Sequence, residues 1–212
     1  MNKYTIFEST RKEIVIEKSR FICTLSKVHN DAEAQEFIKK IKKQYWDATH
    51  NCSAYVIGQN SVAERSNDDG EPSGTAGLPM LEVLRKNSLY DVAAVVTRYF
   101  GGVKLGAGGL IRAYTMSVAE AVKKAGLAEV VEMGHFSFLW NVADVGKVLN
   151  VIYRQQLFTV EDVVYEQRAK LKLLLPVGEK DRVEEWLTEA VQQKIELTEE
   201  SRYGEERKVA KV

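Results

Sequence analysis

The sequence predicts an α+β protein made of two domains, residues 1–128 and residues 129–212. The chain has 212 residues, of which 45% are hydrophobic, and this is enough for one large or two small packed cores. Both halves mix strand-like and helix-like hydrophobic spacing. Charge also divides the chain, because residues 1–128 carry 18 Lys and Arg against 14 Asp and Glu, whereas residues 129–212 carry 12 against 16. The first half is therefore mildly basic (+4) and the second mildly acidic (−4).

The first half alternates strand and helix patterns. Short apolar runs predict two strands within residues 13–28, one at 53–58 and one at 92–97, which is nearly all apolar, as in strands buried on both faces. A polar loop is expected at 67–74. Apolar residues at helical spacing predict three helices: from an N-cap at Asn30 or Asp31 to about Tyr45, from Thr75 to about Lys86, and from about Gly109 to Ala125, with Gly126 as the C-terminal cap.

The second half has the order strand, helix, strand, strand, helix, strand. Strands are expected at 136–140, 159–165, 169–175 and 194–197, and helices around 145–152 and 183–191. This βαββαβ order over about 80 residues is typical of the ferredoxin-like fold. The charged tail, Ser201–Val212, is expected to be frayed.

Composition excludes several classes of protein. A net charge of zero excludes a binder whose whole body is basic, although not a local basic site. Two cysteines, Cys23 and Cys52, are too few for a disulfide-rich scaffold or a four-cysteine zinc site. We find no signal peptide and no apolar run long enough for a membrane helix, so we expect a soluble, cytoplasmic protein without a membrane partner.

A glycine-rich turn, RYFGGVKLGAGG at residues 98–109, is the most unusual segment. It holds five of the fourteen glycines and lies between a buried strand and a helix. Glycines next to the free N–H groups of a helix N-terminus form an anion site, and Arg98, Lys104 and Arg112 add positive charge. Tyr99 and Phe100 suit base stacking. The alternative to an anion site is that the glycines only allow a tight turn between the strand and the helix. The segment is neither a P-loop nor a dinucleotide-binding turn.

Two smaller clusters have both a chemical and a structural interpretation. The carboxylates of Asp68, Asp69 and Glu71 are close enough in sequence to hold a magnesium ion, but a solvated loop that caps the next helix explains them equally, and Glu71 suits an ion pair with Arg98 or Arg112. His50 and Cys52 suggest a nucleophile and its base. We favour a buried Cys52 and a hydrogen-bonded His50 as structural groups.

Three ordered motifs resemble one known family. THNCSAY at residues 49–55, DDGEPSGTAG at 68–77 and VVTRYFGGVKLG at 95–106 are similar to the IMPACT family, in particular to its bacterial YigZ type. The resemblance covers residues 1 to about 125. It implies a main domain with a left-handed βαβ fold, shared with a small-subunit ribosomal protein and with domain IV of elongation factor G. The second domain resembles domain V of that factor.

The resemblance also bears on function, because both related folds contact ribosomal RNA. Eukaryotic members restrain a kinase of translation initiation by binding the activator of that kinase, a specific role that we do not carry over. We expect a non-catalytic protein that binds RNA or the ribosome and acts in translation or its regulation, without a metal or cofactor. A protein partner for the acidic second domain is a further expectation. The expected anion-site residues are Arg98, Tyr99, Gly101, Gly102, Lys104, Gly106, Gly108, Gly109 and Arg112, with His50, Asp68, Asp69 and Glu71 around the rim.

The alternative is an enzyme, either a metal-assisted hydrolase or a phosphotransferase for a small molecule. In that case Asp68 and Asp69 would be the magnesium ligands, and the Gly101–Gly109 turn would hold the phosphate of the substrate. Thermal melting with nucleotide and magnesium distinguishes the enzyme from the binding protein, because a tightly bound ligand raises the melting midpoint.

Overall fold

The computed structural model describes residues 3–58 and 63–209, which form two compact units. Unit 1 comprises the described residues of Met1–Glu129 and of Arg207–Val212, and unit 2 comprises Val130–Glu206. The first boundary lies next to the expected cut after Ala128. Residues 207–209, which follow unit 2 in sequence, group with unit 1.

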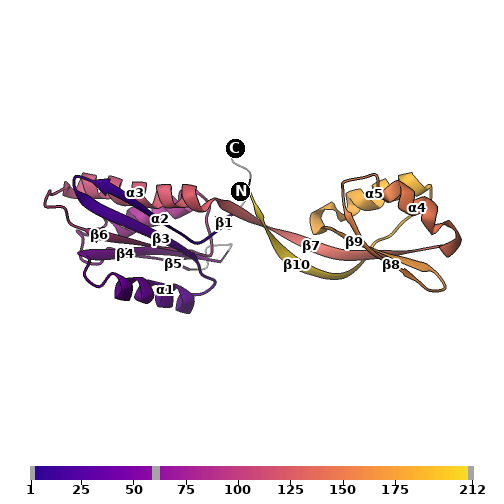
Figure 1. Cartoon of the computed structure of the whole chain (residues 1–212), viewed down its shortest axis with the longest axis horizontal. Coiled ribbons are helices and arrows are strands. Elements are labelled where there is room, and N and C mark those ends of the chain that lie inside the picture. Colours follow the sequence, from indigo (N-terminus) through magenta and orange to yellow (C-terminus); the bar gives the residue numbers. More distant parts are fainter. Residues whose placement is uncertain (1–2, 59–62, 210–212) are drawn as a thin grey trace. The chain divides into compact units, whose positions relative to one another are not determined.

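Unit 1 is built on a five-stranded sheet in the order β2-β3-β6-β4-β5, in which all neighbours are antiparallel (Figure 1). Strands β3 and β4 both pair with β6 and are therefore parallel to each other, with helix α1 between them in sequence, which makes a βαβ unit. The strands are β2 (Thr10–Ile16), β3 (Ser19–Lys27), β4 (His50–Ile57), β5 (Ala63–Asn67) and β6 (Val92–Tyr99), and the helices are α1 (Asp31–Gln44), α2 (Gly77–Lys86) and α3 (Gly106–Ala125).

Both faces of this sheet are covered, α1 on one face and α2 with α3 on the other (Figure 1). Strand β6 contributes alternate residues to the two cores: Val96 packs beneath α2 and α3, and Val95 packs beneath α1. This explains why residues 92–97 are nearly all apolar. A short strand, β1 (Thr5–Ile6), pairs instead with the start of β7 (Leu127–Trp140).

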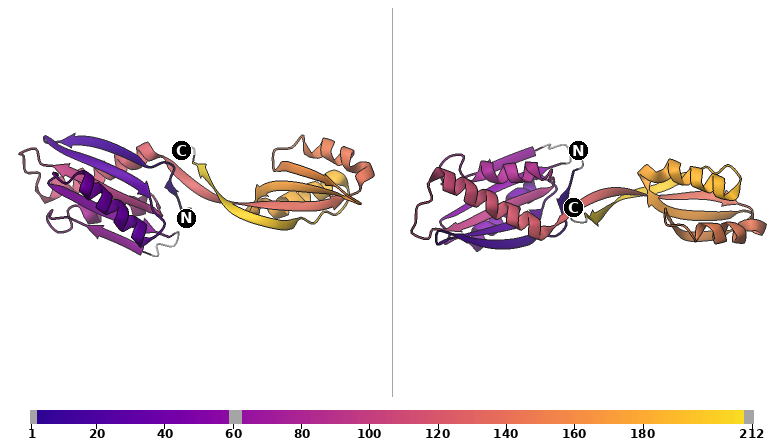
Figure 2. Two further views of the ribbon diagram at one scale, coloured as in Figure 1. Left: turned by 60° about the horizontal axis from the view of Figure 1, so that its bottom comes forward. Right: turned by 90° about the horizontal axis from the view of Figure 1, so that it is seen from above.

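Unit 2 has the βαββαβ order predicted from its periodicity. Its sheet runs β10-β7-β9-β8, and α4 and α5 pack on one face of it (Figure 2). Alternation explains the packing, since Phe136, Phe138 and Trp140 of β7 and Leu171 of β9 all point into the core beneath the helices. The remaining elements are α4 (Val145–Ile152), β8 (Thr159–Tyr165), β9 (Ala169–Pro176), α5 (Lys180–Val191) and β10 (Thr198–Lys208), with two short 3-10 turns at Val142–Asp144 and Val177–Glu179.

Three local expectations were wrong. Strand β10 occupies most of the tail expected to fray and replaces the strand expected at 194–197. Helix α3 begins at Gly106 and not near Gly109. Helix α2 begins at Gly77 without a side-chain cap from the residue before it, whereas Thr75 was expected to cap it. Asn30 is the N-cap of α1 and Gly126 the C-cap of α3, as predicted. In the described part of the chain, no helix combines the length and apolarity needed to cross a bilayer.

Candidate functional site

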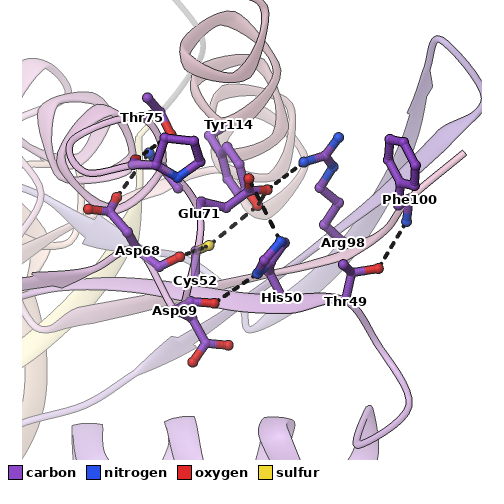
Figure 3. Close-up of polar contacts among 12 residues, drawn as sticks. Thr49, His50, Cys52, Asp68, Asp69, Glu71, Thr75, Arg98, Phe100 and Tyr114 are labelled. Atoms are coloured by element: carbon purple, nitrogen blue, oxygen red, sulfur yellow. Dashed lines mark hydrogen bonds and ion pairs between the residues drawn. The ribbon is translucent and has the colours of Figure 1, made fainter. Parts of the chain in front are cut away.

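A cavity of about 330 Å³ lies at the end of the unit 1 sheet where β6 ends and β4 begins. His50 and Arg98 are directly paired across these strands (Figure 3). The loop before α2 and the start of α3 complete the wall, so all three sequence motifs meet here. The lining residues are Thr49, His50, Glu71, Pro72, Arg98, Phe100, Lys104, Leu105, Gly106, Ala107 and Leu110.

A buried ion pair between Glu71 and Arg98 forms the floor of the site. Their side chains are only 3% and 6% exposed, and Nη1 of Arg98 donates to Oε1 of Glu71 at 2.7 Å. The hydroxyl of Tyr114, on α3, donates to the same oxygen at 2.7 Å. Of the two pairings considered for Glu71, the structure has the one with Arg98.

The Arg98 guanidinium lies within cation–π distance of two aromatic rings. Its central carbon is 5.3 Å from the Phe21 ring centre and 5.6 Å from that of Phe100. A guanidinium carries five N–H donors. Among the described residues only Nη1 has a partner, and Nε is buried without one. Arg98 is therefore held rigidly while most of its hydrogen-bonding capacity remains unused.

His50 has a defined tautomer. Its Nδ1 lies 2.8 Å from the carbonyl oxygen of Asp69. A carbonyl oxygen only accepts hydrogen bonds, so Nδ1 carries the hydrogen when the ring is neutral. Nε2 lies 3.8 Å from Oε2 of Glu71, on the cavity wall. His50 is thus hydrogen-bonded, as expected, and presents Nε2 toward the carboxylate of the floor.

The carboxylates of Asp68 and Asp69 are occupied within the protein and are not placed as a metal site. Asp68 accepts hydrogen bonds from the backbone N–H groups of Gly74, Ala76 and Gly77 at 2.8–3.0 Å, which caps the start of α2. Burial alone would raise the pKa of Asp68, but these three donors hold it below the usual value of 3.8. The loop therefore holds the helix start, as in the structural interpretation.

Asp69 is also paired inside the fold. Its Oδ1 lies 2.6 Å from Nζ of Lys42, and its Oδ2 accepts from the backbone N–H of Asn51 at 2.7 Å. No group of three or more His, Cys, Asp or Glu side chains within residues 3–58 and 63–209 is arranged to hold a metal ion. The magnesium role considered for Asp68 and Asp69 in the enzyme alternative has no geometric support.

Cys52 is buried and hydrogen-bonded within the fold, as in the structural interpretation. Its Sγ donates to the carbonyl oxygen of Asp68 at 2.9 Å and lies 3.3 Å from the Tyr114 hydroxyl. Burial raises the pKa of the Cys52 thiol to about 12, an effect that the hydrogen bond with Tyr114 only partly offsets. The thiolate required of a nucleophile is therefore scarce at neutral pH.

The glycine-rich turn brings the start of α3 against the cavity. A Cβ at Gly101 would lie 2.1 Å from the carbonyl carbon of Lys18, so only glycine fits beneath the β2–β3 hairpin. Gly106 has a φ of +68°, which is ordinary for glycine and strained for other residues. No side chain caps the first turn of α3. Its free N–H groups lie at Gly106 and Ala107, which both line the cavity.

The predicted site residues divide into three groups. Arg98, Lys104, Gly106, His50 and Glu71 line the cavity, and Gly109, Arg112 and Lys104 line a neighbouring hollow of about 520 Å³. Neither wall includes Tyr99, Gly101, Gly102, Gly108, Asp68 or Asp69.

Tyr114 is the site residue that the sequence analysis missed. It lies within the helix expected at about 109–125, and no sequence signal indicates that its hydroxyl reaches Glu71. Thr49 and Pro72 also line the cavity; both lie within the quoted motifs but were not among the expected site residues.

Comparisons with known proteins agree with the motifs. The family model described as the Impact N-terminal domain matches residues 17–122, and one described as a domain of unknown function matches residues 143–194. IMPACT family member YvyE of Bacillus subtilis is 50% identical over 200 residues, which cover 92% of this chain and 90% of the relative. YigZ of Escherichia coli is 40% identical over 111 residues, 51% of this chain and 54% of the relative.

A solved structure also matches nearly the whole chain. It is described as the crystal structure of a hypothetical protein, and it covers 93% of this chain and 97% of its own with a TM-score of 0.59 and 26% sequence identity. The two-domain α+β architecture is thus shared along the chain. With the match over residues 17–122 and the half-identical relative, these comparisons show that the protein belongs to the IMPACT family.

Proposed function

We propose that this IMPACT family member is a non-catalytic, cytoplasmic RNA-binding protein that acts on the ribosome in translation or its regulation. In this proposal, the cavity at the end of the unit 1 sheet holds a phosphate of the RNA. The observation that carries it is Arg98, a nearly buried side chain on the cavity wall whose guanidinium has a single hydrogen bond among the described residues.

The charge balance of the cavity suits an anion. Glu71 neutralises Arg98, so Arg98 offers N–H donors without net charge. Lys104 is exposed on the wall and has no ion pair in the described part of the chain, so it supplies the positive charge. The uncapped first turn of α3 adds free N–H groups and the positive end of the helix dipole. Donors and charge therefore converge on the same space.

Arg112 extends the site along α3. It is exposed in the neighbouring hollow, which shares Lys104 with the cavity. Successive phosphates of a nucleic-acid strand would reach first one and then the other of these two cations. A polymer of phosphates therefore suits the pair of hollows better than a single small anion does. The resemblance to folds that contact ribosomal RNA favours RNA as that polymer.

The test is a binding series with purified protein, labelled single-stranded RNA, duplex RNA and the 30S and 50S ribosomal subunits over a range of salt. Affinity should fall steeply with salt, because bound phosphates release counterions. Lys104→Ala should weaken binding and lower the salt slope by about 0.7–0.9 for each phosphate that the variant no longer neutralises. Lys123→Ala is the matched control, since Lys123 is exposed at the other end of the same helix.

Two outcomes would contradict the proposal. Absence of binding to every RNA and to both subunits removes RNA as the ligand. Equal affinities for Lys104→Ala, Lys123→Ala and the unchanged protein remove the cavity as the place of binding.

A further inference from the structure

Trp46 is the most exposed large hydrophobic side chain in the described part of the chain, with 82% of its surface accessible. It lies in the turn between α1 and β4, directly after the basic end of the helix, in the segment KKIKKQYW at residues 39–46. The simplest explanation for lysines at a helix C-terminus is their favourable interaction with the helix dipole. That explanation does not account for an indole ring left in water.

The turn that carries Trp46 is firmly tied to the end of the sheet. The backbone N–H of Ala48 donates to the carbonyl of Tyr45 at 3.1 Å, and that of Thr49 donates to the carbonyl of Arg98 at 2.9 Å. The Tyr99 hydroxyl donates to Asp47 at 2.8 Å. None of these bonds uses the Trp46 side chain. The ring is therefore presented from a rigid support and is not needed to form it.

This turn leads directly into the cavity wall. Thr49 and His50 follow Trp46 by three and four residues, and both line the cavity. Phe100, 48% exposed, lies on the same wall, and its backbone N–H donates to the Thr49 hydroxyl at 3.1 Å. Trp46 is thus close in sequence to the wall of a cavity that offers hydrogen-bond donors to an anion.

The charged residues that precede Trp46 in sequence are mainly positive. Lys39, Lys40 and Lys43 are exposed and have no ion pair among the described residues, whereas Lys42 is paired with Asp69. The nearest acidic side chain, Asp47, is hydrogen-bonded to Tyr99. Unpaired cations next to an exposed aromatic ring form the platform that proteins use for single strands, in which bases stack on rings and phosphates meet cations.

We propose that Trp46 stacks on an unpaired base of single-stranded RNA, with Lys39 and Lys43 contacting the phosphates on either side of it. The inference rests on the proposed RNA-binding function and adds the kind of RNA that is bound. A duplex keeps its bases stacked on one another, so its bases are unavailable to the indole. Trp46 therefore makes the protein prefer single-stranded over double-stranded RNA.

The experiment uses the full chain and an oligouridine, whose bases are unpaired. Binding should quench the intrinsic fluorescence, because of the three tryptophans Trp46 is the exposed one, Trp140 is 8% exposed and Trp186 is partly buried in the core of unit 2. Trp46→Ala should weaken oligouridine binding about fivefold to 150-fold, the range for loss of one stacked base. The salt slope should stay unchanged, since the variant still neutralises the same number of phosphates.

The matched control is Tyr153→Ala, because Tyr153 is an aromatic side chain that is 65% exposed in unit 2. It should leave the affinity for oligouridine as it is. Affinity for a duplex RNA should be the same for Trp46→Ala and for the unchanged protein. Circular dichroism should show both variants folded.

The outcomes separate this inference from the proposed function. If Trp46→Ala binds oligouridine as tightly as the unchanged protein while Lys104→Ala binds more weakly, Trp46 does not stack and the phosphate cavity stands. If Trp46→Ala alone weakens binding, the stacking platform stands and the cavity does not hold a phosphate. If the unchanged protein binds neither oligouridine nor ribosomal subunits, both proposals fail, and a protein surface is the remaining use for the exposed ring.

Discussion

Glu71 is the residue on which the geometry of the cavity most depends. It accepts hydrogen bonds from Arg98 and Tyr114, both with little exposure to solvent. Glu71→Gln keeps the shape of the side chain but leaves the Arg98 charge buried without its partner. Removing one member of a buried pair costs about 3–5 kcal/mol. We expect a loss of that size in the free energy of unfolding, measured by urea denaturation at pH 7.

The control for this prediction is Glu13→Gln. Glu13 forms a two-bond ion pair with Arg20, but both side chains are exposed, and exposed pairs contribute about 0–1 kcal/mol. If both variants lose the same small amount of stability, Arg98 is solvated in the absence of Glu71 and the floor of the site is not a buried pair.

For single residues, the sequence predicted which ones form the site better than it predicted the contacts that they make. Glu71 and Arg98 were both singled out, and their pairing was one of two possibilities. The sequence contains no signal that distinguishes Arg98 from Arg112 as the partner, because the choice depends on how strand β6, which carries Arg98, and helix α3, which carries Arg112, pack against the loop of Glu71. Arg98 is fixed by its pairing with His50 on β4, a contact between residues distant in sequence.

Helix α2 shows how one element depends on the loop before it. The Asp68 carboxylate, with its lowered pKa, accepts from the N–H groups at the helix start. A carboxyl group whose pKa is lower in the folded state than in the unfolded state stabilises the fold above the unfolded value, near 3.8. That contribution disappears as the pH falls through the folded pKa.

We therefore expect Asp68→Asn to lose about 1.5–3 kcal/mol of stability at pH 7, the range for hydrogen bonds to a charged group. The difference from the unchanged protein should shrink as the pH falls below about 3.8, because both proteins then carry a neutral side chain. Urea denaturation at a series of pH values measures this difference in stability between the two proteins. Glu8→Gln is the control, since Glu8 is exposed and has no ion pair within the described ranges. A stability difference that does not depend on pH would contradict the role of the Asp68 carboxylate in capping α2.

Element prediction succeeded where a hydrophobic face was present and failed where it was absent. The helices and the longer buried strands were expected from apolar spacing, whereas the two-residue strand β1, although buried, is too short to show a spacing and was missed. Strands β5 and β10 were missed, because AERSN and TEESRYGEERK have almost no buried side chain and hence no alternation to detect. Both are held by backbone pairing to a neighbour, and an amino-acid sequence encodes such pairing only weakly.

The whole molecule has separate cores in its two units. Unit 1 buries side chains on both faces of its sheet, whereas unit 2 buries the face beneath α4 and α5. Leu84 in unit 1 and Leu171 in unit 2 are both fully buried. Leu→Ala in such positions costs about 2–5 kcal/mol. We expect two unfolding transitions, with Leu84→Ala lowering the stability of unit 1 and Leu171→Ala that of unit 2.

Hydrogen exchange followed by mass spectrometry measures the stability of each unit separately, because peptides from β6 report on unit 1 and peptides from β9 report on unit 2. Each substitution should accelerate exchange in its own unit and leave the other near its original rate. A single transition in which either substitution accelerates exchange in both sets of peptides would show that the chain unfolds as one cooperative body.

The division of the chain has a consequence for its synthesis. The described part of unit 1 comprises residues before Val130 and also residues 207–209, and the backbone N–H of Val209 donates to the carbonyl of Leu127 at 2.9 Å. Domains fold in order as the chain leaves the ribosome. Here residues 3–129 of unit 1 are translated before unit 2, whereas the backbone hydrogen bond between Val209 and Leu127 forms only after unit 2 has been translated. Folding of unit 1 during synthesis therefore proceeds at first without the residues that follow unit 2.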